Sequence, residues 1–223
     1  MERKKALIIG ASGGIGSALK EALSAKGIDV LGLSRSGDGL DITDEQSVAR
    51  VLGALEDTFD LIVIASGALV IDGQEPEKSL RQISGRAMLD QFAVNAVGPA
   101  LIMAHAARLL PKERPAHLAA LSARVGSIGD NRLGGWYSYR AAKAALNQIV
   151  KTASIELARS HKQLCCVALH PGTVETPFTQ NYAARHATVP AREAAENLLD
   201  VLQGLEPAQT GRFFDWSGQE VLW

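Results

Sequence analysis

The chain has 223 residues, of which 47% are hydrophobic and 21% are charged, and its formal net charge is −1. A chain of this length can bury a sizeable core, and it suits one large α/β domain better than two small ones. The nearly neutral balance lacks the basic excess that nucleic acids or anionic membranes select. No apolar run approaches the length needed to span a bilayer, so we expect neither a membrane nor a nucleic acid as a partner.

Short apolar runs alternate with helical patterns from the N-terminus onward. Residues 4–10 (KKALIIG) predict a strand, residues 17–27 a helix closed by a glycine, and residues 28–35 a second strand. Residues 43–55 predict a helix with Thr43 as its N-cap. The first apolar run is too short for a signal peptide, and we expect a cytoplasmic protein.

The second half continues this alternation, with one long helical pattern between its strands. The predicted strands are 59–67, 115–123, 163–170 and 212–216, and the predicted helices are 87–110 and one that begins near Tyr137. Such alternation predicts a doubly wound parallel sheet within a single domain. Ligands of such sheets bind outside the carboxyl ends of the strands.

The cysteines and histidines show no metal-binding pattern. Cys165 and Cys166 are adjacent in a predicted strand, so their side chains point to opposite faces of the sheet. We therefore predict buried, reduced thiols with neither a disulfide nor a shared metal, and the spacing of the histidines predicts no metal site.

A glycine-rich turn, GASGGIG, follows the first predicted strand. Gly10, Gly14 and Gly16 permit positive φ angles and a close approach of backbone to a phosphate, and Ser12 adds a hydroxyl donor. The helix that follows offers free N–H groups at its positive end. This context favours a dinucleotide site, although a tight turn without a ligand is the alternative reading.

The second predicted strand ends in Ser34 and Arg35, at the position where NAD-preferring enzymes usually carry an acidic residue. An arginine binds a 2′-phosphate well, so this end favours NADP(H) over NAD(H), unless Arg35 is only a solvated surface residue. Asp41 either faces the adenine or begins a helix turn.

The stretch WYSYRAAKAALN places Tyr139 and Lys143 one helical turn apart. A nearby ammonium stabilises a phenolate, so the pair predicts a tyrosine with a lowered pKa that acts as a general acid or base. Tyr137 has alanine at the matching position. Taken alone, the pair is better explained as a surface contact, because this spacing is common in proteins.

Two further features lie near the expected carboxyl ends of strands. Pro99 cannot donate to the carbonyl of Asn95, which leaves a backbone acceptor within a helix or simply marks a kink. Pro171 and Gly172 end the predicted strand 163–170, and the turn after them would bring Val174 and Thr176 to a nicotinamide.

The combined pattern of GASGGIG, the Asn95 helix, YRAAK and HPGTVET, in this order, resembles the short-chain dehydrogenase/reductase family, and its C-factor-like branch in particular. The resemblance implies a Rossmann-type domain over residues 1–223, with about seven mainly parallel strands in the order 3-2-1-4-5-6-7. It implies Tyr139 as acid/base, Lys143 as its partner and ribose ligand, and Asn95 as the holder of a relay water. The implied cofactor-binding residues are Gly10, Ser12, Gly13, Gly14, Ile15, Gly16, Ser34, Arg35, Asp41, Ile42, Ser66, Gly67, Asn95, Tyr139, Lys143, Pro171, Gly172, Val174 and Thr176.

The sequence departs from the family pattern at two places. The family's asparagines after the third strand are absent, because residues 64–67 read IASG. The family's substrate-orienting serine falls on Ala123, and Ser122 lies one residue earlier, on the opposite face of a regular strand. A bulge would bring Ser122 into the site, where we place the catalytic serine, and Ser127 is the alternative.

The resemblance implies an NADP(H)-dependent oxidoreductase that interconverts a small-molecule carbonyl and an alcohol. The alternative is a catalytically weak nucleotide-sensing or signalling protein on the same fold. We expect a substrate lid over residues 175–200, with Phe178 and Tyr182 in its wall. The apolar face of the Tyr139 helix favours a homodimer or homotetramer, and packing against its own sheet is the alternative reading of that face.

Overall fold

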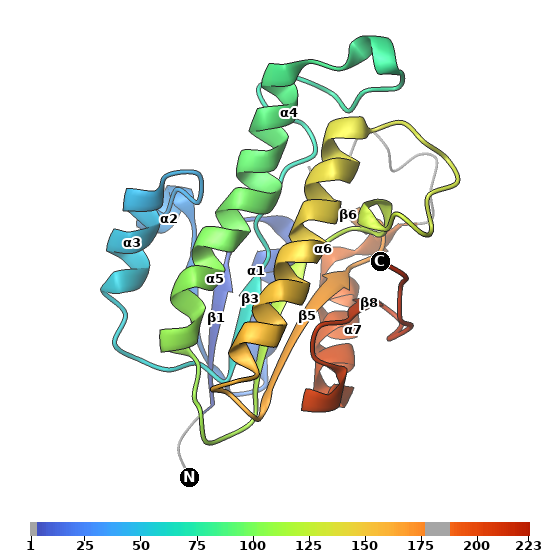
Figure 1. Cartoon of the computed structure of the whole chain (residues 1–223). Coiled ribbons are helices and arrows are strands. Elements are labelled where there is room, and N and C mark those ends of the chain that lie inside the picture. Colours follow the sequence, from blue (N-terminus) through green and yellow to red (C-terminus); the bar gives the residue numbers. More distant parts are fainter. Residues whose placement is uncertain (1–3, 177–187) are drawn as a thin grey trace.

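A parallel sheet forms the centre of the molecule (Figure 1). The computed structural model describes residues 4–176 and 188–223. The strands of this sheet are β1 (Lys5–Ile9), β2 (Asp29–Leu33), β3 (Leu61–Ile64), β4 (Ala116–Leu121), β5 (Leu164–His170) and β8 (Phe213–Asp215). A separate two-stranded pair is formed by β6 (Val174–Glu175) and β7 (Val189–Pro190).

Helices cover both faces of the sheet. Their bounds are α1 (Gly14–Ala25), α2 (Arg35–Asp38), α3 (Glu45–Gly53), α4 (Gly85–Phe92), α5 (Gly98–Leu109), α6 (Tyr137–Leu157) and α7 (Ala191–Gly204). Buried side chains of α3, α5 and α6 join one hydrophobic cluster, and those of α1 and α7 join another. In Figure 1, α5 and α6 lie in front of the strands.

The order of the main sheet is β2-β1-β3-β4-β5-β8, and every neighbouring pair is parallel. This confirms the doubly wound parallel fold. The number of strands in this sheet is six, where the resemblance implied about seven. β2 is one edge of this sheet, and residues 39–44, between α2 and α3, form no further strand beyond it.

Alternation along the strands divides the core between the two faces. Leu7 and Ile9 belong to the cluster under α5 and α6, whereas Ala6 and Ile8 belong to the cluster under α1 and α7. The same alternation separates the two cysteines of β5, which are buried and free in opposite clusters. The prediction of buried thiols on opposite faces of the sheet is confirmed.

Two local predictions need correction. The N-cap of α3 is Asp44, whose carboxylate accepts from the Gln46 amide, while the hydroxyl of Thr43 donates to Asp41. A carboxylate outcompetes a hydroxyl here because it carries charge at the positive end of the helix. The expected single helix over 87–110 is α4 and α5 joined by a π-helical turn over Ala93–Val97.

This π-helical turn follows from Pro99. The Gly98 amide donates to the Ala93 carbonyl, five residues back, and proline supplies no amide for the next bond. By length and composition, the continuous helix Gly85–Leu109 is apolar enough to cross a membrane, which the sequence reading overlooked. Ile102, Ala106 and Leu109 bury it against the sheet, as expected for a core helix.

The predicted lid is only partly described. Residues 191–200 belong to α7, whose Ala195, Leu198 and Leu199 pack in the cluster that contains α1, so this part of the expected lid is a core helix. Phe178 and Tyr182 lie outside the described residues, and a lid between β6 and β7 stays a prediction.

Candidate active site

A cavity of about 630 Å³ opens at the carboxyl ends of β1, β3, β4 and β5. This volume is within the range of small-molecule and cofactor sites. The predicted residues that line it are Ser12, Gly13, Gly14, Ile15, Ser66, Gly67, Ser122, Tyr139, Lys143, Pro171, Gly172, Val174 and Thr176. The fold therefore brings the glycine turn, the tyrosine–lysine pair and the Pro-Gly turn to a single cavity.

The glycine turn forms one end of this cavity. Gly10 has a φ of 86°, and a Cβ placed on it would lie 2.8 Å from the backbone nitrogen of Ser66. A Cβ on Gly14 would lie 2.5 Å from the methyl group of Thr176, and one on Gly16 would overlap the Gly10 carbonyl. The turn therefore needs glycine for packing as well as for backbone approach. Gly13 precedes α1 as its N-cap without a side chain, which leaves the helix amides accessible.

The end of β2 carries a carboxylate that the sequence reading missed. Ser34 caps α2, and the Asp38 carboxylate accepts from both the amide and the hydroxyl of Ser34. Arg35 is exposed beside this group. Asp41 accepts from the amide and hydroxyl of Thr43, and these bonds hold its pKa below the ordinary value. Asp41 thus shapes the turn before α3.

Tyr139 and Lys143 are both buried, at 5% and 3% exposure, on the first turns of α6. The ammonium of Lys143 lies 5.8 Å from the centroid of the Tyr139 ring and donates to the Leu121 carbonyl at 2.9 Å. The proximity predicted from the spacing is therefore present. Tyr137 precedes them at the first position of α6 and is not among the residues that line the cavity.

Burial dominates the electrostatics of this pair. It raises the pKa of Tyr139 above its ordinary value and lowers the pKa of Lys143 to about 7. The lowering of the phenol pKa that we expected from the ammonium is absent, because desolvation also disfavours the ammonium charge that would cause it. The phenol is therefore held in its protonated form.

Asn95 anchors the loop after β3. Its side-chain oxygen accepts from the Ala68 amide at 3.1 Å, and its amide donates to the Ala68 carbonyl and to Gln91, each at 2.8 Å. Gln91 in turn donates to the Leu69 carbonyl. These bonds hold the loop after β3, and Gln91 was not selected from the sequence. Ile42 lies against Gly98 at the start of α5, outside the cavity lining.

Ser122 lies in the cavity wall, but its hydroxyl donates to Asn147 of α6 at 2.6 Å. A hydroxyl has one proton, so this proton is not directed at a substrate. Ala123 also lines the cavity, whereas Ser127 is not among the lining residues and accepts from the Asp130 amide. A role for Ser122 as the substrate donor stays a prediction.

His170 is a cavity residue that the sequence analysis did not select. It ends β5, directly before Pro171, and its Nδ1 is buried without a hydrogen-bond partner. Burial lowers the pKa of this imidazole to about 4, against an opposing attraction from Asp215 on β8. His170 is therefore uncharged at neutral pH.

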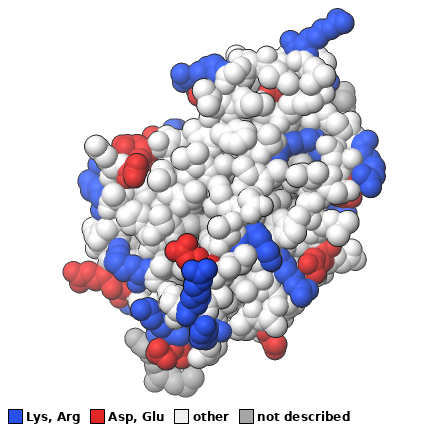
Figure 2. All heavy atoms as spheres, viewed as in Figure 1, with Lys and Arg blue, Asp and Glu red and all other residues white. Residues whose placement is uncertain are grey.

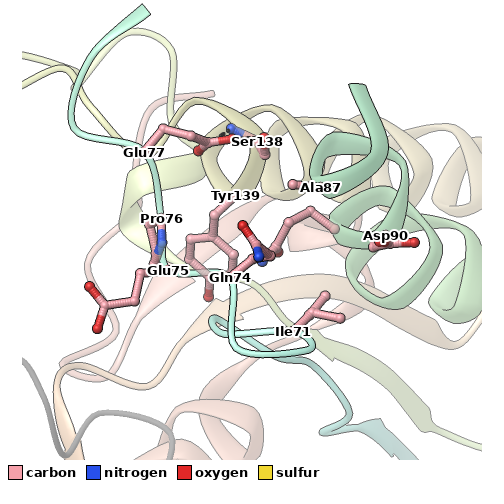
Figure 3. Close-up of a pocket in the computed structure, with 10 residues that line it drawn as sticks. Ile71, Gln74, Glu75, Pro76, Glu77, Ala87, Asp90, Ser138 and Tyr139 are labelled. Carbon is pink, nitrogen blue, oxygen red and sulfur yellow. Dashed lines mark hydrogen bonds between the residues drawn. The ribbon is translucent and has the colours of Figure 1, made fainter. Parts of the chain in front are cut away.

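A second feature absent from the sequence reading lies at the N-terminus of α6, in the small cavity of Figure 3. The Glu77 carboxylate accepts from the amide and the hydroxyl of Ser138, the residue directly before Tyr139. Residues 77 and 138 are 61 positions apart, so only the tertiary structure reveals the contact.

The chain is similar to known oxidoreductases. A family model described as enoyl-(acyl carrier protein) reductase matches residues 36–210. The 1-hydroxy-2-glutathionyl-2-methyl-3-butene dehydrogenase of Rhodococcus sp. (strain AD45) is 28% identical over 97% of this chain and 98% of its own length. C-signal of Myxococcus xanthus is 38% identical over 61% of this chain and 78% of its own length, which confirms the likeness to the C-factor branch.

Solved structures show the same fold. A protein described as a short-chain dehydrogenase/reductase, from Burkholderia multivorans and solved with bound NADP, has 26% identity and a TM-score of 0.84 over the full length of both chains. An NADPH-bound carbonyl reductase from chicken fatty liver, 22% identical, has a TM-score of 0.83 over the full length of both chains. The chain therefore belongs to the short-chain dehydrogenase/reductase family.

Proposed function

We propose that this oxidoreductase reduces a small-molecule carbonyl compound to an alcohol with NADPH, with Tyr139 as the proton donor. The observation that carries the proposal is the meeting of Tyr139, Lys143 and the glycine turn at one cavity. The relative from Rhodococcus is named as a dehydrogenase of a hydroxy compound, which is the same interconversion.

The glycine turn fits a dinucleotide, because side chains at Gly10, Gly14 and Gly16 would collide with neighbouring groups where backbone must approach a phosphate. When bound, NADPH supplies the hydride that reduces the carbonyl carbon. Lys143 lines this cavity and would bind the nicotinamide ribose, and the Pro171–Gly172 turn forms another part of the cavity wall.

Tyr139 is suited to the reductive direction. Its raised pKa keeps the phenol protonated, and the alkoxide that forms on reduction needs this proton. The carbonyl of Asn95 has no amide donor from Pro99, and we propose that it holds the relay water that returns a proton to Tyr139.

The NADP preference rests on Arg35, which is exposed at the end of β2. The solved relative from Burkholderia multivorans binds NADP. Asp38 opposes the preference, because its carboxylate lies at the same end of the strand and would repel a 2′-phosphate. The proposal is that the guanidinium of Arg35 outweighs this charge.

Cofactor binding tests this balance directly. NADPH at about 100 times its Kd should add about 2.7 kcal/mol of stability, or roughly 5 to 10 °C in Tm. Arg35→Ala should weaken NADPH binding by about 10- to 100-fold and leave NADH binding unchanged. Asp38→Asn removes the carboxylate that would repel the 2′-phosphate, and this variant should strengthen NADPH binding. A parent that prefers NADH, or Arg35→Ala with an intact preference, would refute the argument.

Turnover tests the role of Tyr139. Oxidation of NADPH with a panel of aldehydes and ketones should be slower by about 100- to 10,000-fold in Tyr139→Phe. Tyr137→Phe changes the same residue type on the same helix turn and should retain the parent rate. Equal losses in the two variants would remove Tyr139 from its assigned role.

A nucleotide-sensing or signalling protein is the second candidate. The hydroxyl of Ser122 is committed to Asn147 and the family serine is Ala123, so the described cavity lacks the usual second donor to a carbonyl oxygen. The likeness to C-signal favours the same reading. Firm NADPH binding without turnover on any carbonyl compound would select this candidate.

We also propose a homo-oligomer that forms through the α4–α6 face. The middle of this face carries few charged side chains, which gather at its margins (Figure 2). Leu89, Val97 and Ile155 are 69%, 48% and 55% exposed on these helices. A second copy of the chain would cover them, and Leu89→Glu should shift the mass measured by light scattering toward the monomer. The buried free thiols are compatible with a cytoplasmic location, which we likewise propose.

A further inference from the structure

The helix that carries Tyr139 begins without a cap of its own. Its N-cap residue, Trp136, has a φ of 54° and makes no side-chain capping bond. This conformation is strained for a bulky residue, and it follows two glycines that also have positive φ. The first turn of α6 therefore needs a hold from elsewhere in the molecule.

Glu77 provides this hold from the loop between β3 and α4. Its backbone carbonyl accepts from the Trp136 amide at 2.5 Å, and its carboxylate accepts from the Ser138 amide at 3.1 Å. The other carboxylate oxygen accepts from the Ser138 hydroxyl. Figure 3 shows Glu77 and Ser138 pointing toward one another above the ring of Tyr139.

The charge of Glu77 is suited to this position. The residue is only 6% exposed, and burial opposes its ionisation, yet the hydrogen bonds from Ser138 hold the pKa of the carboxyl below its ordinary value. A buried carboxylate at the positive end of a 21-residue helix is stabilised by the helix dipole as well. The Glu77 side chain is thus the anionic cap of α6, and it comes from a distant part of the same chain.

The location of this cap gives it a functional consequence. Ser138 is covalently joined to Tyr139, and Lys143 lies on the next turn, so a displacement of the first turn moves both groups relative to the cavity. We propose that Glu77 is a positioning residue that fixes Tyr139 for proton transfer by capping α6. This inference rests on the proposed reductase function for its catalytic consequence, and on geometry alone for the capping.

The test compares Glu77→Ala and Glu77→Gln with Glu75→Ala. Glu75 is an exposed residue of the same type in the same loop, so its variant is the matched control. The glutamine oxygen still accepts from the Ser138 amide, whereas alanine removes both acceptors. Amide hydrogen exchange is measured on the peptide 136–143, and kcat and KM are measured per NADPH-binding site.

In Glu77→Ala, the amides of this peptide should exchange about fivefold faster than in the parent. The kcat should fall by about 10- to 100-fold, while KM stays within about threefold of the parent value. Glu77→Gln should recover most of the kcat, and Glu75→Ala should match the parent. A residue that only stabilised the fold would lower Tm and the number of binding sites without changing kcat per site. If Glu77→Ala does not fold, Glu77→Gln and Ser138→Ala, which removes only the hydroxyl donor, should show smaller changes of the same kind.

The proposal would be overturned if Glu77→Ala had the same hydrogen-exchange rate and the same kcat as the parent. It would also be overturned if Glu77→Ala lost kcat while the exchange of this peptide stayed unchanged. If the parent reduced no carbonyl compound, the proposed function would fail. The exchange of peptide 136–143 would still decide whether Glu77 holds Tyr139.

Discussion

Asn95 offers the sharpest test of how the site is held together. Its side chain is fully buried at the π-helical turn and bonds both the amide and the carbonyl of Ala68, as well as Gln91. Asn95→Ala removes these partners and leaves buried polar groups unsatisfied. The loop that carries Gly67 should then separate from the helix, and this loop lies beside Lys143.

The expected loss follows from these three hydrogen bonds. An unsatisfied buried donor or acceptor costs about 1–3 kcal/mol, and water will enter to satisfy part of the freed set. We therefore expect Asn95→Ala to lower the free energy of unfolding by about 3 kcal/mol, or Tm by roughly 6 to 12 °C for a chain of this size. Gln148, which is exposed and whose side chain donates to Thr152, is the matched control, and Gln148→Ala should change stability by less than about 0.5 kcal/mol.

Urea unfolding of the parent, Asn95→Ala, Gln91→Ala and the double variant measures the coupling between the two side chains. The coupling energy should be between about 0.5 and 3 kcal/mol, because both groups belong to one network. An additive cycle, or a loss in Asn95→Ala no larger than in Gln148→Ala, would show that Asn95 does not anchor the loop.

Three further predictions concern other parts of the fold. In urea unfolding, Gly10→Ala should lower the free energy of unfolding by at least about 2 kcal/mol, because the φ of Gly10 is positive and a Cβ would lie 2.8 Å from backbone. Gly53→Ala should raise it by up to about 1 kcal/mol, because a Cβ there would meet no atom within 4 Å. Burial raises the pKa of Cys165 and Cys166 to about 12, so a thiol reagent should label neither in native protein and both in urea; native labelling would contradict their burial. The pKa of His170 in the folded protein is about 4, below the ordinary 6.5. The stability contributed by the neutral imidazole is therefore complete above pH 6.5 and is lost as pH falls through 4. The parent should lose up to about 3 kcal/mol more than His170→Asn over this window in urea unfolding, and parallel pH curves would contradict the shift.

The parallel sheet was predictable because its strands are short apolar runs and its helices have a different period. Chain-local chemistry also fixed the glycine turn, the Tyr139–Lys143 spacing and the missing amide at Pro99. Local competition was harder to judge. Asp44 displaced Thr43 as the cap of α3. The two residues are neighbours and both are good caps, and the charge of the carboxylate at the positive end of the helix favours Asp44.

The sequence by itself determined the fold class, the family and many of the residues that gather at the cavity, because each depends on residue type and spacing along the chain. Only the tertiary structure decided the state of those residues. Burial of Tyr139 and Lys143 raised the pKa of the phenol, where the spacing had predicted a lowered pKa. The hydroxyl of Ser122 donates its hydrogen bond to Asn147. Glu77 reached the start of α6 from 61 residues away. Desolvation and long-range hydrogen bonds depend on what surrounds a side chain, and spacing along the chain does not contain that information.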